Sequence, residues 1–169
     1  MIQKLKNILL DNYLSWRLKH LKAIPRAHDF SKELREVKQI LIVLPETISL
    51  DDIQPTFIQQ LYEIFGQNVR ISTFEKRTFR KEDSTWLGLP KKEYMDIFAS
   101  EQIDLVIDLN ESEDKFCTYV CALLPAPIKV NLAPGTFDHV YNLHIRSDGS
   151  KPLAHRLETI IRYFKTLMG

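Results

Sequence analysis

The chain has 169 residues, and its 23 Lys and Arg residues nearly balance its 22 Asp and Glu residues. This length suits one domain with a substantial core, and the balanced charge argues against a nucleic-acid-binding surface. No apolar run approaches the roughly 20 residues that a membrane-spanning helix needs. The N-terminus lacks a secretory-signal pattern and the two cysteines provide no disulfide framework, so we expect a cytoplasmic protein.

The first predicted element is a helix over residues 1–22, a segment without Gly or Pro that ends before Pro25. We therefore divide the chain into an N-terminal amphipathic helix, residues 1–24, and an α/β domain, residues 25–169. Successive helical residues turn by about 100°, so the apolar positions form two stripes about 130° apart. One stripe comprises Ile2, Leu5, Leu9, Tyr13 and Trp16, and the other comprises Leu10, Leu14, Leu18 and Leu21.

One stripe is enough to dock a helix on its own domain, so the second stripe needs another cover. Three interpretations are open. The domain and the linker bury both stripes, a partner protein or a second copy of the chain covers one, or one stripe lies on a membrane surface. Peripheral membrane contact is the least favoured, because an interfacial helix usually opposes one apolar face to one strongly charged face. The helix does carry the cations Lys4, Lys6, Arg17, Lys19 and Lys22. The predicted partner interface comprises Ile2, Leu5, Leu9, Tyr13, Trp16, Leu10, Leu14 and Leu21.

The rest of the chain alternates between strand and helix patterns. Residues 40–44 form an unbroken apolar run, which is typical of a strand covered on both faces. Further strands are predicted at residues 69–74, 105–109, 128–132 and 141–145. Helices are predicted from Asp51 or Asp52 to Gly66, over residues 91–100, around residues 116–124 and over residues 153–167, with a polar loop at residues 75–90. This alternation predicts a three-layer Rossmann-like or flavodoxin-like α/β fold with a mostly parallel five-stranded sheet in the order 2-1-3-4-5.

Ligands of such folds bind at the carboxyl edge of the sheet, here residues 44–52 and 109–115. The predicted ligand-binding residues there are Glu46, Thr47, Ser49, Asn110, Glu111 and Ser112, and the catalytic candidates are Asp51, Asp52 and Asp108. The first loop has no glycine for a phosphate to approach. Acids that cap helix starts explain its carboxylates better than a metal site does, so we expect neither metal nor cofactor. For Asp108, inside an apolar strand, a structural role is favoured.

The run Ile40–Val43, the twelve residues that follow it up to Pro55, and the strand Asp104–Leu109 resemble the N-terminal domain of the lipopolysaccharide heptosyltransferases. These are GT-B glycosyltransferases of family 9, and the resemblance spans about residues 38–146. It implies the acceptor half of such an enzyme. However, the family's Gly-Asp pair, whose Asp is the proposed general base, aligns with Ser49 and Leu50. Leucine cannot accept a proton, so the base is absent unless Asp51 or Asp52 substitutes from a shifted position. The family also binds its nucleotide-sugar donor in a second domain, for which this sequence has no counterpart, so we lean away from an enzyme.

Two other resemblances carry less chemistry. The strand Asp104–Asn110 and the Lys151-Pro152 pair resemble response-regulator receiver domains, which would place the phospho-acceptor on Asp108. Receivers bind Mg²⁺ through acids directly after their first strand, where this chain has Leu44 and Pro45. Over the whole length the chain resembles small conserved bacterial proteins of unknown function, through its N-terminal helix, a linker containing Arg26 and His28, and the element Trp86-Leu87-Gly88. That resemblance implies no activity.

Two smaller clusters favour structural explanations. Cys117 and Cys121 lie one helical turn apart without a companion pair of ligands, so we expect buried thiols. The basic residues of the polar loop are interleaved with aromatic and acidic ones, which favours a solvated loop over a phosphate site. They are Lys76, Arg77, Arg80 and Lys81.

The leading hypothesis is therefore a non-catalytic α/β module, resembling the acceptor half of a GT-B glycosyltransferase, that binds a protein through its N-terminal helix. One alternative is a metal-assisted enzyme that acts on a sugar or nucleotide at the acidic sheet edge. Another is a degenerate receiver-like signalling domain.

Overall fold

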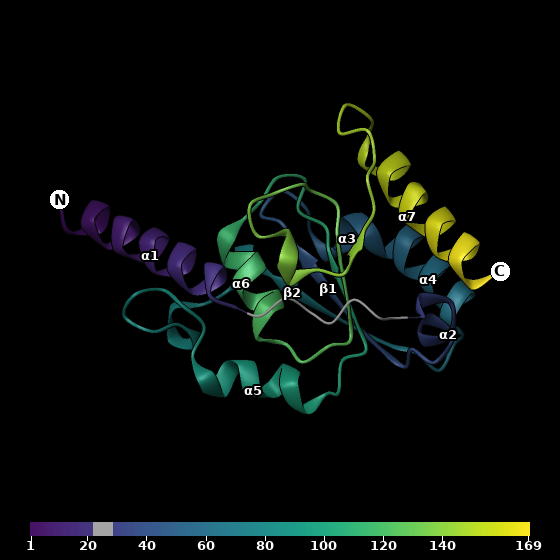
Figure 1. Ribbon diagram of the computed structural model, residues 1–169, viewed down its shortest axis with the longest axis horizontal. Coiled ribbons are helices and arrows are strands. Elements are labelled where there is room, and N and C mark those ends of the chain that lie inside the picture. The colour runs from purple at the N-terminus through teal and green to yellow at the C-terminus, as the bar shows by residue number, and fades with distance from the viewer. Residues whose placement is uncertain (22–28) are drawn as a thin grey trace.

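The computed structural model describes residues 1–21 and 29–169 and has the predicted architecture (Figure 1). Five strands form one parallel sheet in the order β2-β1-β3-β4-β5. The strands are β1 (Gln39–Leu44), β2 (Arg70–Glu75), β3 (Leu105–Asp108), β4 (Ile128–Asn131) and β5 (Leu143–His144). The helices are α1 (Ile2–Lys19), α2 (Phe30–Arg35), α3 (Leu50–Ile53), α4 (Gln59–Phe65), α5 (Lys92–Ser100), α6 (Lys115–Leu123) and α7 (Leu153–Met168). The predicted helix end at residue 22, the boundary between residues 24 and 25, and the linker residues Arg26 and His28 lie outside the described residues.

The sheet is covered on both faces, as the unbroken apolar run of β1 predicted, and all six residues of β1 are buried. Alternate residues of β1 contribute to two separate hydrophobic clusters. Ile40, Ile42 and Leu44 pack with α2, α4 and α7 on one face. Leu41 and Val43 pack with α1, α5 and α6 on the other.

Three elements differ from the sequence prediction. Helix α2 was not predicted, because it has only six residues and a single buried one, Leu34. It is capped by Asp29, which accepts a hydrogen bond from the Lys32 backbone N–H at 3.3 Å. The helix predicted up to Gly66 is interrupted between α3 and α4 by a wider π-helical turn over Gln54–Ile58, where a proline lacks the N–H that a regular helix needs.

The strand predicted over residues 141–145 is reduced to the two residues of β5. The side chain of Asn142 is responsible for part of this difference. It accepts a hydrogen bond from the Lys129 backbone N–H at 2.8 Å and donates one to the Pro127 carbonyl at 2.7 Å. The predicted polar loop at residues 75–90 also contains two short 3-10 turns, Lys76–Thr78 and Lys81–Asp83. Because all five strands are parallel, the loops that follow them meet at one edge of the sheet.

Candidate functional site

The loop after β1 brings its predicted acids to the carboxyl edge, but uses one of them to start a helix. Ser49 and Asp52 form a capping box, in which the Asp52 carboxylate accepts hydrogen bonds from the Ser49 N–H at 2.7 Å and its hydroxyl at 2.8 Å. These bonds hold the pKa of Asp52 below its ordinary value. Thr47 and Asp51 are exposed. Leu50, at the position that the glycosyltransferase resemblance assigns to the general base, packs against the hydrophobic core.

Asp108 lies at the end of β3 and is only 4% exposed. One carboxylate oxygen accepts hydrogen bonds from the Asn110 backbone N–H at 3.0 Å and side-chain amide at 2.6 Å. The other accepts the hydroxyl proton of Tyr141 at 2.6 Å. Burial raises the pKa of the Asp108 carboxyl, against the opposing effect of these donors. The Cys121 thiol lies 4.0 Å from this second oxygen, so the carboxylate has four donors within the protein, which suits the structural role favoured for this residue.

The other acids of the loop after β3 have partners from distant parts of the chain. Glu111 pairs with Arg156 of α7. Asp114 caps α6 by accepting from the Cys117 N–H at 2.9 Å, and its other oxygen lies 2.6 Å from the Lys76 ammonium. Although burial opposes the shift, the bonds from Lys76 and Cys117 lower the pKa of Asp114. The carboxylate of Glu46 lies 3.6 Å from the same ammonium.

The edge leaves little room for a ligand between these groups. A cavity of about 10 Å³ lies there, roughly the space that one water molecule requires. Its lining residues are Asp108, Asn110, Ser112, Glu113, Asp114, Thr118, Asn131, Ala133 and Tyr141. Two of the predicted ligand-binding residues, Asn110 and Ser112, thus reach a common cavity, while Glu46, Thr47 and Ser49 do not line it.

Sequence reasoning missed the residues that strands β4 and β5 bring to this edge. Asn131 ends β4 and donates to the Asp138 carboxylate at 3.1 Å. Arg146, just after β5, donates to the side-chain oxygen of Asn131 at 3.2 Å. Both residues follow predicted strands, so applying the carboxyl-edge rule to strands four and five would have identified them.

The two cysteines lie on α6, and both are buried, as expected. Burial raises the pKa of the Cys121 thiol well above its ordinary value, so the thiol stays protonated. Within residues 1–21 and 29–169, no group of three or more His, Cys, Asp or Glu side chains is arranged to hold a metal ion.

Part of the basic-aromatic cluster in the loop after β2 packs against the rest of the protein, and part of it is exposed to solvent. Phe79 packs in an aromatic group with Phe74, Tyr94 and Phe116. The Lys76 ammonium lies 5.8 Å from the ring centre of Phe116 in addition to its acidic neighbours. The expectation of a solvated loop is therefore wrong for Lys76, which is held by Asp114, and holds for the exposed Arg80 and Lys81.

The second region of interest is α1, whose two apolar stripes have different surroundings. Leu14 and Leu18 are buried against α6, and Leu10, Tyr13 and Leu21 pack partly against the same core. Four of the five residues of the other stripe face outward, with exposed fractions of 85% for Ile2, 59% for Leu5, 45% for Leu9 and 55% for Trp16, whereas the fifth, Tyr13, packs partly against the core. Ile8, at 54%, adds to this exposed apolar surface and was not singled out from the sequence. The stripe that includes Leu14 thus belongs to the domain's own core.

Among the described residues, the polar contacts between α1 and the domain involve the C-terminal half of the helix. Asp11 pairs with Lys115 at 2.8 Å, and the Leu18 carbonyl lies 2.8 Å from a ring nitrogen of His139. The Trp86-Leu87-Gly88 element also lies beside the helix, since a Cβ at Gly88 would sit 3.9 Å from Leu10. In Figure 1 the N-terminal half of α1 projects beyond the rest of the fold.

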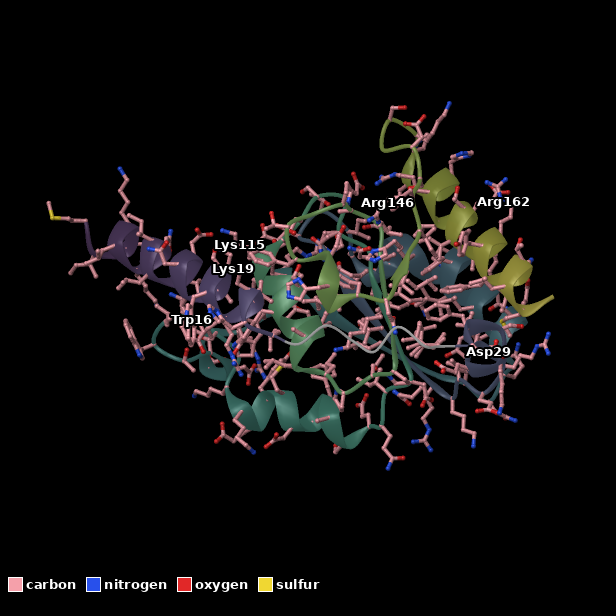
Figure 2. The ribbon with its side chains drawn as sticks, viewed as in Figure 1. Trp16, Lys19, Asp29, Lys115, Arg146 and Arg162 are labelled. Atoms are coloured by element: carbon pink, nitrogen blue, oxygen red, sulfur yellow. The ribbon has the colours of Figure 1, made fainter. Side chains whose placement is uncertain are left out.

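A groove of about 500 Å³ lies between this anchored half of α1 and the loops after β3 and β4. Figure 2 shows Trp16, Lys19 and Lys115 in this part of the molecule. The lining residues are Ser15, Trp16, Lys19, His20, Glu113, Lys115, Thr136 and Phe137. The groove is much larger than the cavity at Asp108, and α1 forms one of its walls.

The family model of DUF6913, a family of unknown function, matches residues 10–167. The chain belongs to the DUF6913 family. This membership confirms the resemblance to proteins of unknown function. The range matched to DUF6913 contains the docked stripe and every residue that lines the groove, whereas Ile2, Leu5 and Leu9 precede it. No curated protein matches the chain.

Among solved structures, this DUF6913 chain is similar to a glycosyl transferase family 9 protein from Veillonella parvula DSM 2008. The two share 17% sequence identity with a TM-score of 0.50, over 78% of this chain and 41% of the other. The chain thus spans less than half the length of the glycosyl transferase. The likeness confirms the predicted resemblance in fold, at an identity too low to carry an activity.

No helix in the described part of the chain combines the length and apolar character needed to cross a membrane. The exposed apolar residues of α1 are interspersed with polar and charged ones, including Lys4, Lys6 and Asn12.

Proposed function

We propose that this protein is a non-catalytic binding module that recognises another protein through the outer face of α1. The observation that carries the proposal is the exposed apolar stripe of Ile2, Leu5, Leu9 and Trp16. Large apolar side chains gathered on one surface are typical of protein interfaces. Amphipathic helices that bind a groove present such anchors at spacings of three, four and seven residues, and Ile2, Leu5 and Leu9 have this spacing.

The projecting half of α1 supports the same conclusion. Within the described residues, no hydrogen bond, ion pair or ring contact joins residues 1–9 to residues beyond α1. An isolated helix of this length is marginal in water, because helices gain most of their stability from packing. A partner that covers the outer stripe would stabilise this half of the helix and remove its apolar surface from water.

The state of the carboxyl edge favours binding over catalysis. The carboxylates of Asp108, Glu111 and Asp114 each have hydrogen-bonding or ionic partners within the chain. The position of the glycosyltransferase base is a leucine that packs on the core. A catalytic acid or base needs to reach a substrate proton. The three carboxylates instead bind groups of the protein's own loops and helix ends.

A protein suits the outer stripe better than a lipid bilayer. A helix that lies in a membrane surface opposes a broad apolar face to a strongly charged one. In the C-terminal half of α1 the opposite face is instead apolar and docked on α6.

Site-specific photo-crosslinking in cells that make the protein tests the proposal. A photoreactive benzophenone side chain would replace Leu5 or Leu9 on the outer stripe, or, as a control, the exposed Asn7 on another side of the same half-helix. We expect one discrete protein adduct from positions 5 and 9 and none from position 7. A mass of twice the chain would identify a second copy as the partner.

Equal adducts from the stripe and the control position, adducts with lipid only, or no adduct would each contradict the proposal. A charged substitution on the outer stripe, Leu9→Glu, should leave the fold intact. It should keep the melting temperature of the unaltered protein, since a surface substitution changes stability by no more than about 0.5 kcal/mol. Deleting residues 1–9 is a suitable second test, whereas deleting all of α1 would also remove Leu14 and Leu18 from the core.

A further inference from the structure

The groove beside α1 has apolar walls from two separate elements. Trp16 contributes one wall from the helix and is 55% exposed, and Phe137 contributes the other from the loop after β4. The volume of about 500 Å³ falls in the range of about 300–1,000 Å³ that is usual for ligand sites. Because Trp16 also ends the exposed stripe, the groove continues the surface proposed to bind a partner.

Two charged side chains of the groove, the cation Lys19 and the acid Glu113, have no ionic partner among the described residues. No carboxylate among the described residues pairs with Lys19, which is exposed at the rim. Lys115 is already paired with Asp11 at 2.8 Å. The acid of the groove, Glu113, uses one oxygen to accept the Phe137 backbone N–H at 2.9 Å.

His20 adds a second polar group on the same side as Lys19. Its Nδ1 lies 2.7 Å from the Trp16 carbonyl, so Nδ1 serves as the donor in this contact. Nε2 has no hydrogen-bond partner among the described residues. The imidazole ring also packs on the indole of Trp16, with 5.2 Å between ring centres.

The walls are fixed by contacts outside the groove. The loop after β4 is tied to α1 through His139 and the Leu18 carbonyl, 2.8 Å apart. The same loop passes so close to Glu113 that a Cβ at Gly135 would overlap the carboxylate. A site whose walls are already fixed loses less conformational entropy when a ligand binds.

We infer that this groove binds a short acidic segment of the partner protein. An apolar side chain of that segment packs between Trp16 and Phe137, and an adjacent carboxylate pairs with Lys19. The inference rests on the proposed function and deepens it by naming the chemistry of the partner. Charge complementarity selects an acidic segment over α1 of a second copy, because Lys4, Lys6, Arg17 and Lys19 outnumber its one acid, Asp11.

Nuclear magnetic resonance titration of the full chain with a blocked Asp-Leu-Phe-Asp peptide tests this inference. The chain has two tryptophans, and Trp86 does not line the groove, so its indole signal is an internal reference for that of Trp16. We expect the acidic peptide to shift the Trp16 indole signal and leave that of Trp86 in place. The neutral Asn-Leu-Phe-Asn peptide should bind more weakly by at least the effect of one exposed ion pair, about twofold to fivefold.

The charge of the rim is tested by Lys19→Met, which keeps most of the apolar stem. This variant should bind the acidic peptide about twofold to fivefold more weakly. The matched control Lys4→Met, which removes the same charge from the same helix outside the groove, should bind it unchanged. Equal binding of the acidic and neutral peptides, equal shifts of both tryptophans, or no effect of Lys19→Met would overturn the inference.

Two further comparisons separate this inference from the proposal on which it rests. Crosslinks from positions 5 and 9 together with an unshifted Trp16 would leave the proposed function standing and refute the groove. Peptide binding without any protein crosslink would instead refute the proposed function, and with it the partner named here. If vesicles containing phosphatidylglycerol broaden the Trp16 signal while the peptide leaves it unchanged, the surface binds lipid and the inference is wrong.

Discussion

Substituting one leucine from each stripe of α1 tests the assignment of one stripe to the core and the other to the surface. Leu18 is fully buried against α6, whereas Leu9 is 45% exposed on the projecting half of the same helix. Leu18→Ala leaves a cavity in a packed core, which costs about 2–5 kcal/mol of unfolding free energy. Leu9→Ala removes surface that is already largely in water, so its effect should stay within about 0.5 kcal/mol. Both substitutions exchange the same residues within one helix, so any difference in helix propensity nearly cancels.

Urea denaturation followed by circular dichroism measures both effects. With a slope of about 2 kcal/mol/M, we expect the midpoint of Leu18→Ala to fall by about 1 M or more at an unchanged slope. The midpoint of Leu9→Ala should remain within about 0.3 M of the unaltered protein. Equal losses for the two variants would mean that both stripes are buried within one chain, and no loss for either would mean that α1 is undocked. Either result would refute the reasoning.

Three other predictions concern the carboxyl edge of the sheet. Tyr141→Phe should lower the unfolding free energy by about 1–3 kcal/mol in urea melts, because the buried Asp108 carboxylate loses its donor at 2.6 Å; an unchanged midpoint would show that another donor replaces the hydroxyl. Because burial raises the pKa of Asp108 above its ordinary 3.8, its protonation favours the folded state. The stability of the unaltered protein relative to Asp108→Asn should therefore be greatest below pH 3.8 and decline as pH rises through the raised pKa; a rise over that interval would contradict this sign. Finally, millimolar Mg²⁺ or a nucleotide should leave the melting temperature within about 1 °C, whereas a ligand present at a hundred times its Kd would add about 2.7 kcal/mol and raise it by several degrees.

The fold was predictable because each strand and most helices have a recognisable pattern of apolar residues in the sequence. The unbroken run of β1 requires cover on both faces, and strands that alternate with helices require parallel pairing. What escaped prediction depends on single contacts. Helix α2 buries only Leu34 and shows no stripe. Strand β5 is shortened where Asn142 uses its side chain to bind the backbone beside β4.

The location of the candidate site was predictable from the sequence, but the partners of its charged side chains were not. The sequence locates Glu46, Asn110 and Glu111 at one edge, because parallel strands end together. It cannot show that Glu111 meets Arg156 or that Asp114 meets Lys76, since these partners are far apart in the chain and meet only through tertiary packing. In the same way, the two stripes of α1 are visible in the sequence, but only the fold shows which of them is docked.

The loops at the carboxyl edge of the sheet also hold α1 in place. The C-terminal half of the helix is held by Lys115, which follows β3, and by His139, which follows β4. These loops belong to the edge where a Rossmann-like fold ordinarily binds its ligand. By contacting them, α1 becomes a wall of the larger opening near this edge, the groove of about 500 Å³, while the polar groups below it are satisfied around a cavity of about 10 Å³. The polar groups at the strand ends therefore hold the loops that form the groove, which agrees with the proposal that recognition takes place at the helix and its groove.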